Sequence, residues 1–183
     1  MENKKALILV DIQNDYFPNG KMKLSGSEAA SINAGKILYD FREKKLEIFH
    51  VCHVSTRPDA AFFLPETSGA EIHTNVKPVN GETVIIKYFP NSFRGTHLFD
   101  MLKEKEITEL VICGMMTHMC IDATTRAAKD FGFNCILIGD ACATRDLVIS
   151  GITVMADDVH NSFLAALNGF YSSVISVNEY LSM

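Results

Sequence analysis

The chain has 183 residues, 48% of them hydrophobic and 21% charged, which predicts one folded domain over residues 1–183 with a substantial core. A formal net charge of -5 excludes a basic surface spread over the whole fold, so we expect no nucleic-acid partner. The longest apolar runs are too short to span a bilayer, and the first residues lack the apolar segment of a signal peptide. We therefore expect a cytoplasmic protein with no membrane partner.

Strands and helices are predicted to alternate along the chain. Short apolar runs predict strands over residues 6–10, 46–54, 83–86, 110–113, 134–138 and 173–176. Apolar residues at helical spacing predict helices that begin at residue 27 and extend over residues 96–105, 118–131 and 153–170. This alternation is typical of a parallel sheet with helices on both faces. Residues 55–82 interrupt it with a long loop, and loops of that length are usually functional.

Three chemically complementary residues follow predicted strands. Asp11 follows the first, Lys87 the third, and Cys120 begins the helix after the fourth. Because ligands bind beyond the carboxyl ends of parallel strands, the three residues are expected to converge at one edge of the sheet. A helix N-terminus and a nearby ammonium would both lower the pKa of the thiol. Taken singly, each residue is better explained as a turn former, a solvated lysine or a packed cysteine.

Four segments resemble motifs of the isochorismatase-like cysteine hydrolases. These segments are residues 10–17 (VDIQNDYF), 87–93 (KYFPNSF), 114–120 (GMMTHMC) and 140–144 (DACAT). They occur in the family's order, and the resemblance extends over essentially the whole chain. As a set they are far more specific than any one of them alone.

The resemblance implies a catalytic triad of Asp11, Lys87 and Cys120. It also implies a cis peptide between Met115 and Met116, and an oxyanion hole formed by the backbone N–H groups of Met116 and Cys120. The implied reaction is hydrolysis of a carbon–nitrogen bond in a small amide or ureido substrate through a thioester on Cys120. In this reaction Asp11 takes the thiol proton and passes it to the leaving amine.

The fold implied is a three-layer αβα sandwich with a mainly parallel six-stranded sheet in the order 3-2-1-4-5-6. This order makes the first and fourth strands neighbours, so Asp11 and Cys120 could meet. The family also implies a homo-oligomer, a dimer or a tetramer. Phe17, Tyr88 and His118 flank the three catalytic positions and are candidates for lining the substrate pocket. The apolar cluster at residues 62–64 in the long loop would suit either a lid over the pocket or a subunit contact.

No metal and no other cofactor are expected. Nicotinamidases of this family carry an Asp-x-His metal motif after the second strand, whereas residues 50–55 here read HVCHVS. Alternation along a strand would place His50 and Cys52 on one face and His53 on the other, which argues against a shared ion. No glycine-rich nucleotide motif is present, so neither NAD nor ATP is implied.

Other functions stay open on the sequence alone. The chain could catalyse the nicotinamidase or isochorismatase reaction itself, or it could be a catalytically idle small-molecule binder or assembly subunit. A thiol redox sensor would need Cys142 or Cys113 within disulfide reach of Cys120. The five cysteines form no C-x-x-C pair, which indicates a reduced compartment rather than a disulfide framework.

Overall fold

The computed structural model describes residues 4–183, and a parallel sheet forms its centre. Its strands are β1 (Lys5–Val10), β2 (Glu47–His53), β3 (Thr83–Lys87), β4 (Glu109–Met115), β5 (Asn134–Ala143) and β8 (Ser173–Ile175). They lie in the order β3-β2-β1-β4-β5-β8, and every neighbouring pair is parallel. Counted among themselves, the six strands have the order 3-2-1-4-5-6. The predicted fold is therefore confirmed, and β1 and β4 are neighbours.

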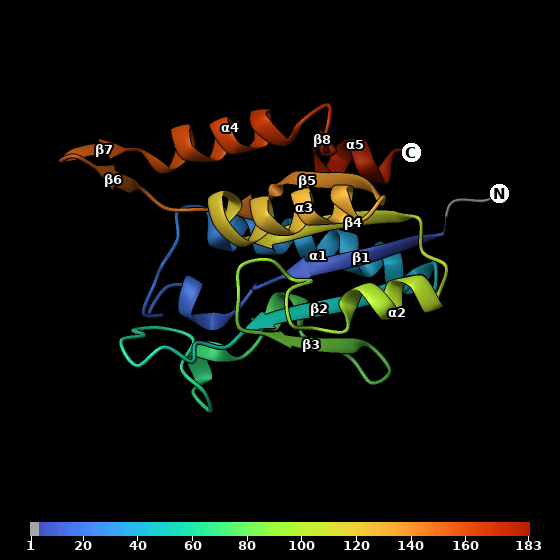
Figure 1. Cartoon of the computed structure of the whole chain (residues 1–183), viewed down its shortest axis with the longest axis horizontal. Helices are drawn as coiled ribbons and strands as arrows, with labels where there is room; N and C mark the ends of the chain where they lie inside the picture. The colour runs from blue at the N-terminus through green and yellow to red at the C-terminus, as the bar shows by residue number, and fades with distance from the viewer. Residues whose placement is uncertain (1–3) are drawn as a thin grey trace.

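Helices cover both faces of the sheet (Figure 1). The first face packs on α1 (Ser27–Glu43) and α5 (Val177–Leu181), and the second on α2 (Leu98–Glu104), α3 (Asp122–Asp130) and α4 (Ala156–Leu167). Successive residues of β1 alternate between the two cores: Leu7 and Leu9 join the first core, and Ile8 and Val10 join the second. The alternation of side chains along the strand therefore supplies apolar residues to the cores on both faces of the sheet.

The last third of the chain differs from the prediction. The helix expected over residues 153–170 begins only at Ala156, because a hairpin of β6 (Leu147–Ile149) and β7 (Ile152–Val154) precedes it. Ser150 and Gly151 both have positive φ, which suits the tight turn between twisted strands. β5 also extends to Ala143, beyond its predicted end, and the short helix α5 was not predicted.

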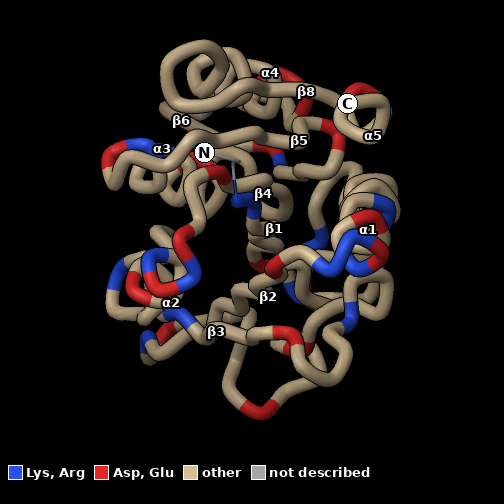
Figure 2. Tube along the Cα trace, turned by 90° about the vertical axis from the view of Figure 1, so that its right-hand side faces the viewer, with Lys and Arg blue, Asp and Glu red and all other residues tan. Residues whose placement is uncertain are grey.

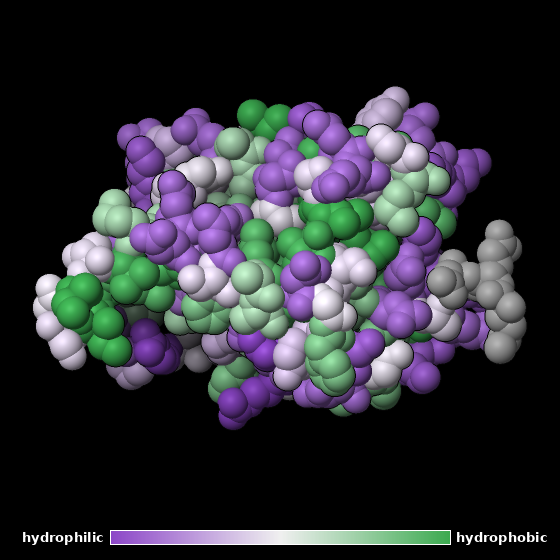
Figure 3. All heavy atoms as spheres, turned by 90° about the horizontal axis from the view of Figure 1, so that it is seen from above, coloured by the Kyte–Doolittle hydropathy of each residue, from purple (hydrophilic) through white to green (hydrophobic). Residues whose placement is uncertain are grey.

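The β6–β7 hairpin extends away from the body of the molecule (Figure 1). Apolar atoms gather at that end of the surface (Figure 3), where Val148, Ile149 and Ile152 each have at least 66% of their surface exposed. Elsewhere the charged residues of both signs lie mainly on the outer helices (Figure 2). Within residues 4–183, no helix has the length and apolar character needed to cross a bilayer.

The long loop is fixed to the edge of the sheet rather than free. The buried Asp15 carboxylate accepts hydrogen bonds from the Phe63 and Lys21 amides, at 2.6 and 3.1 Å. Phe63 is 1% exposed, and its ring packs edge-on against Tyr16 with centroids 4.6 Å apart. The start of the loop is therefore part of the core in a single chain.

Candidate active site

Asp11 and Lys87 form an ion pair in the interior of the protein. Asp11 directly follows β1, Lys87 ends β3, and β2 lies between those strands (Figure 1). The long lysine side chain reaches past β2 and places Nζ 2.7 Å from Asp11 Oδ2, with both side chains fully buried. Asp11 Oδ1 is also buried and has no hydrogen-bond partner among residues 4–183. One carboxylate oxygen thus holds the lysine, and the other can accept a proton.

Cys120 is brought to this pair by the turn after β4. The Met115–Met116 peptide is cis, and residues Thr117–Ile121 form a π-helical turn that leads into α3. The single helix expected over residues 118–131 is therefore a π-helical turn followed by an α-helix. The Met116 carbonyl accepts hydrogen bonds from the amides of Met119 and Ile121, which anchors this turn around the cysteine.

Gly114 allows β4 to approach β1 closely at this point. Its φ is +132°, and an added Cβ would lie 2.0 Å from the Val10 carbonyl oxygen. Val10 and Gly114 are paired in the β1–β4 ladder, and Asp11 follows Val10 directly. A side chain at position 114 would therefore separate the strands that carry the acid and the thiol.

The electrostatics differ from the sequence prediction at the thiol. Burial raises the pKa of Cys120 well above its usual range, Asp11 raises it further, and Lys87 lowers it less than they raise it. For Lys87, burial lowers the pKa, but Asp11 and Cys120 together raise it more, and the net increase favours the charged ammonium. The expectation of a lowered thiol pKa was wrong, because it ignored the cost of burying a thiolate. The raised pKa favours the neutral thiol, so nucleophilic attack by Cys120 calls for a base nearby.

The candidate pocket residues lie in different surroundings. His118 Nδ1 is 2.5 Å from the Thr144 hydroxyl oxygen, and its buried Nε2 has no partner within the described part of the chain. Phe17 is buried and stacks on His73 with ring centroids 3.6 Å apart. Tyr88 is half-exposed just beyond β3. Of these three residues, His118 alone has a side-chain hydrogen bond to another described residue, and its partner Thr144 directly follows β5.

Two residues near the site were missed by the sequence reasoning. Tyr16 is almost completely buried. Burial raises its pKa, Cys120 and Asp11 raise it further, and Arg145 lowers it. Tyr16 therefore links the surroundings of the triad with those of Arg145. Arg145 Nε is buried without a hydrogen-bond partner, and no carboxylate in residues 4–183 lies within 4.0 Å of its guanidinium. Tyr16 belongs to the first recognised motif, and Arg145 directly follows the last.

The histidines of β2 do not form a metal centre with their neighbours. His50 Nε2 lies 2.8 Å from Glu82 Oε2, and Arg42 also binds this carboxylate. Burial raises the pKa of Glu82, but hydrogen bonds from Arg42, the Val79 amide and His50 outweigh it, and the pKa is lowered to about 2. His53 faces Lys87 instead. In the described chain, no three His, Cys, Asp or Glu side chains are grouped so as to hold a metal ion.

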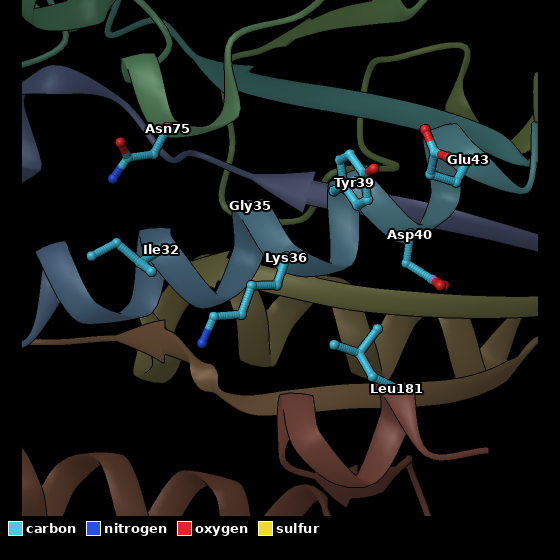
Figure 4. A pocket seen from close by; sticks show the side chains of 8 residues that line it. All are labelled: Ile32, Gly35, Lys36, Tyr39, Asp40, Glu43, Asn75 and Leu181. Carbon is cyan, nitrogen blue, oxygen red and sulfur yellow. The ribbon is translucent and has the colours of Figure 1, made fainter.

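An open groove of about 580 Å³ lies elsewhere, on the outside of α1 (Figure 4). It is lined by Ile32, Gly35, Lys36, Tyr39, Asp40, Glu43, Asn75 and Leu181. Its exposed side chains come from α1 and from the ends of neighbouring elements, and none of the three predicted catalytic residues lines it. The groove contains no cysteine among its described lining residues, so it is not where the predicted cysteine chemistry would take place.

The chain resembles known proteins over nearly its whole length. The chain matches the model of the isochorismatase domain over residues 5–179. The protein belongs to the isochorismatase family. It is 51% identical over 176 residues to the uncharacterized isochorismatase family protein YddQ of Bacillus subtilis, covering 96% of this chain and 98% of the relative. A streptothricin hydrolase of Streptomyces noursei is 40% identical over 148 residues, covering 78% of this chain and 56% of the relative.

The solved structures show the same fold. The crystal structure of an isochorismatase from Pseudomonas putida has a TM-score of 0.90 and 32% identity, covering 96% of this chain and 89% of that chain. This isochorismatase-family protein is therefore a hydrolase with the family's α/β architecture.

Proposed function

We propose that this hydrolase cleaves a carbon–nitrogen bond in a small amide or ureido compound through a thioester on Cys120. The observation that carries the proposal is the buried Lys87–Asp11 ion pair, with its 2.7 Å contact, acting on a buried thiol that cannot ionise by itself. A protonated nucleophile, a carboxylate with a free oxygen and a fixed cation are the parts that base-assisted nucleophilic attack requires.

The reaction proceeds in two halves. Asp11 Oδ1 takes the thiol proton as Cys120 Sγ attacks the carbonyl carbon, and the oxyanion is stabilised by the N–H groups of Met116 and Cys120. Asp11 then donates that proton to the leaving nitrogen, the carbon–nitrogen bond breaks, and a thioester remains. In the second half Asp11 takes a proton from water as the water oxygen attacks the thioester carbonyl. The carbon–sulfur bond then breaks, the acyl group leaves as an acid, and the proton returned by Asp11 restores the thiol. Lys87 stays charged throughout and balances the changing negative charge.

The substrate class follows from the charges around the thiol. The relative named streptothricin hydrolase supports a hydrolytic reaction. Arg145 is a cation without a carboxylate partner in the described chain, and its charge acts on Tyr16 and His118. A guanidinium of this kind binds a carboxylate with two hydrogen bonds. Amides and ureido compounds that carry a carboxylate are therefore the favoured substrates.

The β6–β7 hairpin supports the proposed homo-oligomer. A two-stranded hairpin is marginal in water, and this one exposes Val148, Ile149 and Ile152. Burial of these side chains against a second copy would stabilise it. Light scattering after size-exclusion chromatography, compared with Ile152→Lys, tests this part of the proposal.

The activity is tested by ammonia release from a panel of primary amides and ureido acids, each paired with an analogue that lacks the carboxylate. We expect turnover by the wild type, none by Cys120→Ala, and normal turnover by Cys135→Ala, which removes another buried cysteine. Acid quenching should trap an acyl group on the peptide that contains Cys120. Full turnover by Cys120→Ala would overturn the mechanism, and an inactive wild type across the panel would favour a binding or assembly role.

A further inference from the structure

His53, the last residue of β2, is held beside Lys87 by contacts that fix its backbone. It is paired with Lys87 in the β2–β3 ladder. The fully buried Gln13 side chain donates to the His53 carbonyl at 2.9 Å and accepts from the His53 amide at 2.8 Å. Gln13 also binds the Ala70 carbonyl of the long loop at 2.7 Å, so one side chain joins β1, β2 and the loop. The backbone position from which the imidazole extends is therefore fixed.

The Lys87 ammonium has three N–H donors and no contact with solvent. Asp11 Oδ2 accepts one at 2.7 Å, the Phe89 carbonyl accepts one at 3.2 Å, and His53 Nδ1 lies 3.5 Å from Nζ. An ammonium cannot accept a hydrogen bond, so His53 Nδ1 must present its lone pair and carry its proton on Nε2. The long 3.5 Å distance makes this the weakest of the three contacts.

The charges around His53 favour the neutral ring. Burial lowers its pKa, Asp11 raises it, and Lys87 and Arg57 lower it, with a net decrease. These are the charged groups that act on the ring from β1, β3 and the long loop, and the Phe63 ring packs against it with centroids 6.0 Å apart. A neutral imidazole can therefore act as the third acceptor at neutral pH.

We propose that His53 is a positioning residue for Lys87: its Nδ1 accepts a hydrogen bond from one ammonium N–H in the resting site, and when the thiol is deprotonated this N–H turns to donate to Cys120 Sγ while its proton stays on Nζ. The inference rests on the proposed function, because it assigns His53 to the cation that balances the thiolate. A thiolate at Cys120 would raise the pKa of Lys87 by its charge and by a side-chain hydrogen bond, so the sulfur is within reach of the same ammonium. Protonation of His53 would remove the acceptor and place a second cation beside Lys87, which would weaken the site in acid.

The test uses alkylation of Cys120 by iodoacetamide, followed from pH 5 to 9 by peptide mass spectrometry. In His53→Asn, Oδ1 takes the place of the Nδ1 acceptor but cannot titrate. We expect this variant to react within about twofold of the wild type at pH 8 and to lose the wild-type inflection in acid. In His53→Leu the acceptor is gone, and we expect alkylation at least tenfold slower throughout. His97→Asn, at a highly exposed histidine, should match the wild type.

The outcomes separate the two proposals. Wild-type rates and an unchanged pH profile in both His53 variants would overturn the role of His53 while leaving the proposed function intact. If His53→Leu fails to fold, the retained acid inflection in a folded His53→Asn would by itself overturn it. If Cys120→Ala keeps full turnover of the amides and ureido acids, the proposed function fails, and the inference fails with it.

Discussion

Replacing Lys87 by Met removes one partner of the buried ion pair and leaves the Asp11 carboxylate alone in the interior. Methionine is close to lysine in length and volume, so the change removes the charge without opening a large cavity. At 2.7 Å and an effective dielectric constant of about 20, the lost attraction is about 6 kcal/mol. Removing one partner of a buried pair typically costs about 3–5 kcal/mol. We expect the free energy of unfolding to fall by about that amount at pH 8.

The pH dependence has a definite sign. In Lys87→Met the isolated carboxylate takes up a proton in the folded state, so its folded pKa lies above the unfolded value of about 3.9. The folded protein then binds more protons than the unfolded chain, and stability decreases as pH rises from about 4 toward the raised pKa. The deficit relative to the wild type is therefore smaller at pH 5 than at pH 8.

Urea denaturation followed by circular dichroism at pH 5 and pH 8 measures both quantities. The double variant Asp11→Asn, Lys87→Met is the matched control, because it removes both charges and should recover at least half of the lost stability. A loss below about 1 kcal/mol at pH 8, or a double variant less stable than the single one, would refute the reasoning. It would show that the pair is not held in a low-dielectric interior.

Three further predictions concern other parts of the site. Gly114→Ala forces β1 and β4 apart and should reduce turnover about 100-fold. Gly132→Ala is the control: a Cβ at that glycine has no described atom within 4 Å, so this variant should keep wild-type turnover. Equal turnover by the two variants would contradict the prediction. Asp11→Asn removes the base that takes the thiol proton, so it should lower ammonia release about 10²–10⁴-fold and also slow iodoacetamide alkylation of Cys120 at pH 7; unchanged ammonia release would argue against it. The pKa of Glu82 is lowered to about 2, so its ionised form stabilises the fold above pH 4.5 and this effect is lost toward pH 2. In urea titrations Glu82→Gln should therefore be less stable than the wild type at pH 7 and similar to it near pH 2. A difference in stability that does not change with pH would show that the ionisation of Glu82 is not its cause.

Local pattern was enough to predict the strand–helix alternation and the three residues at the strand ends. Side-chain alternation and the carboxyl ends of parallel strands are consequences of backbone geometry, and that geometry is the same wherever such runs occur. The β6–β7 hairpin was missed because its strands are three residues long and adjoin a helix. Apolar residues in so short a segment fit either period.

Tertiary structure decided the chemistry of the site. The raised pKa of Cys120 follows from burial and from the balance between Asp11 and Lys87, neither of which can be inferred from residue spacing. The contact of His53 with Lys87, and the lack of a partner for Arg145 Nε within residues 4–183, depend on where other elements place their polar groups. The sequence by itself determined which groups reach one edge of the sheet. Only packing determined their distances and solvation, because both depend on residues remote in the chain.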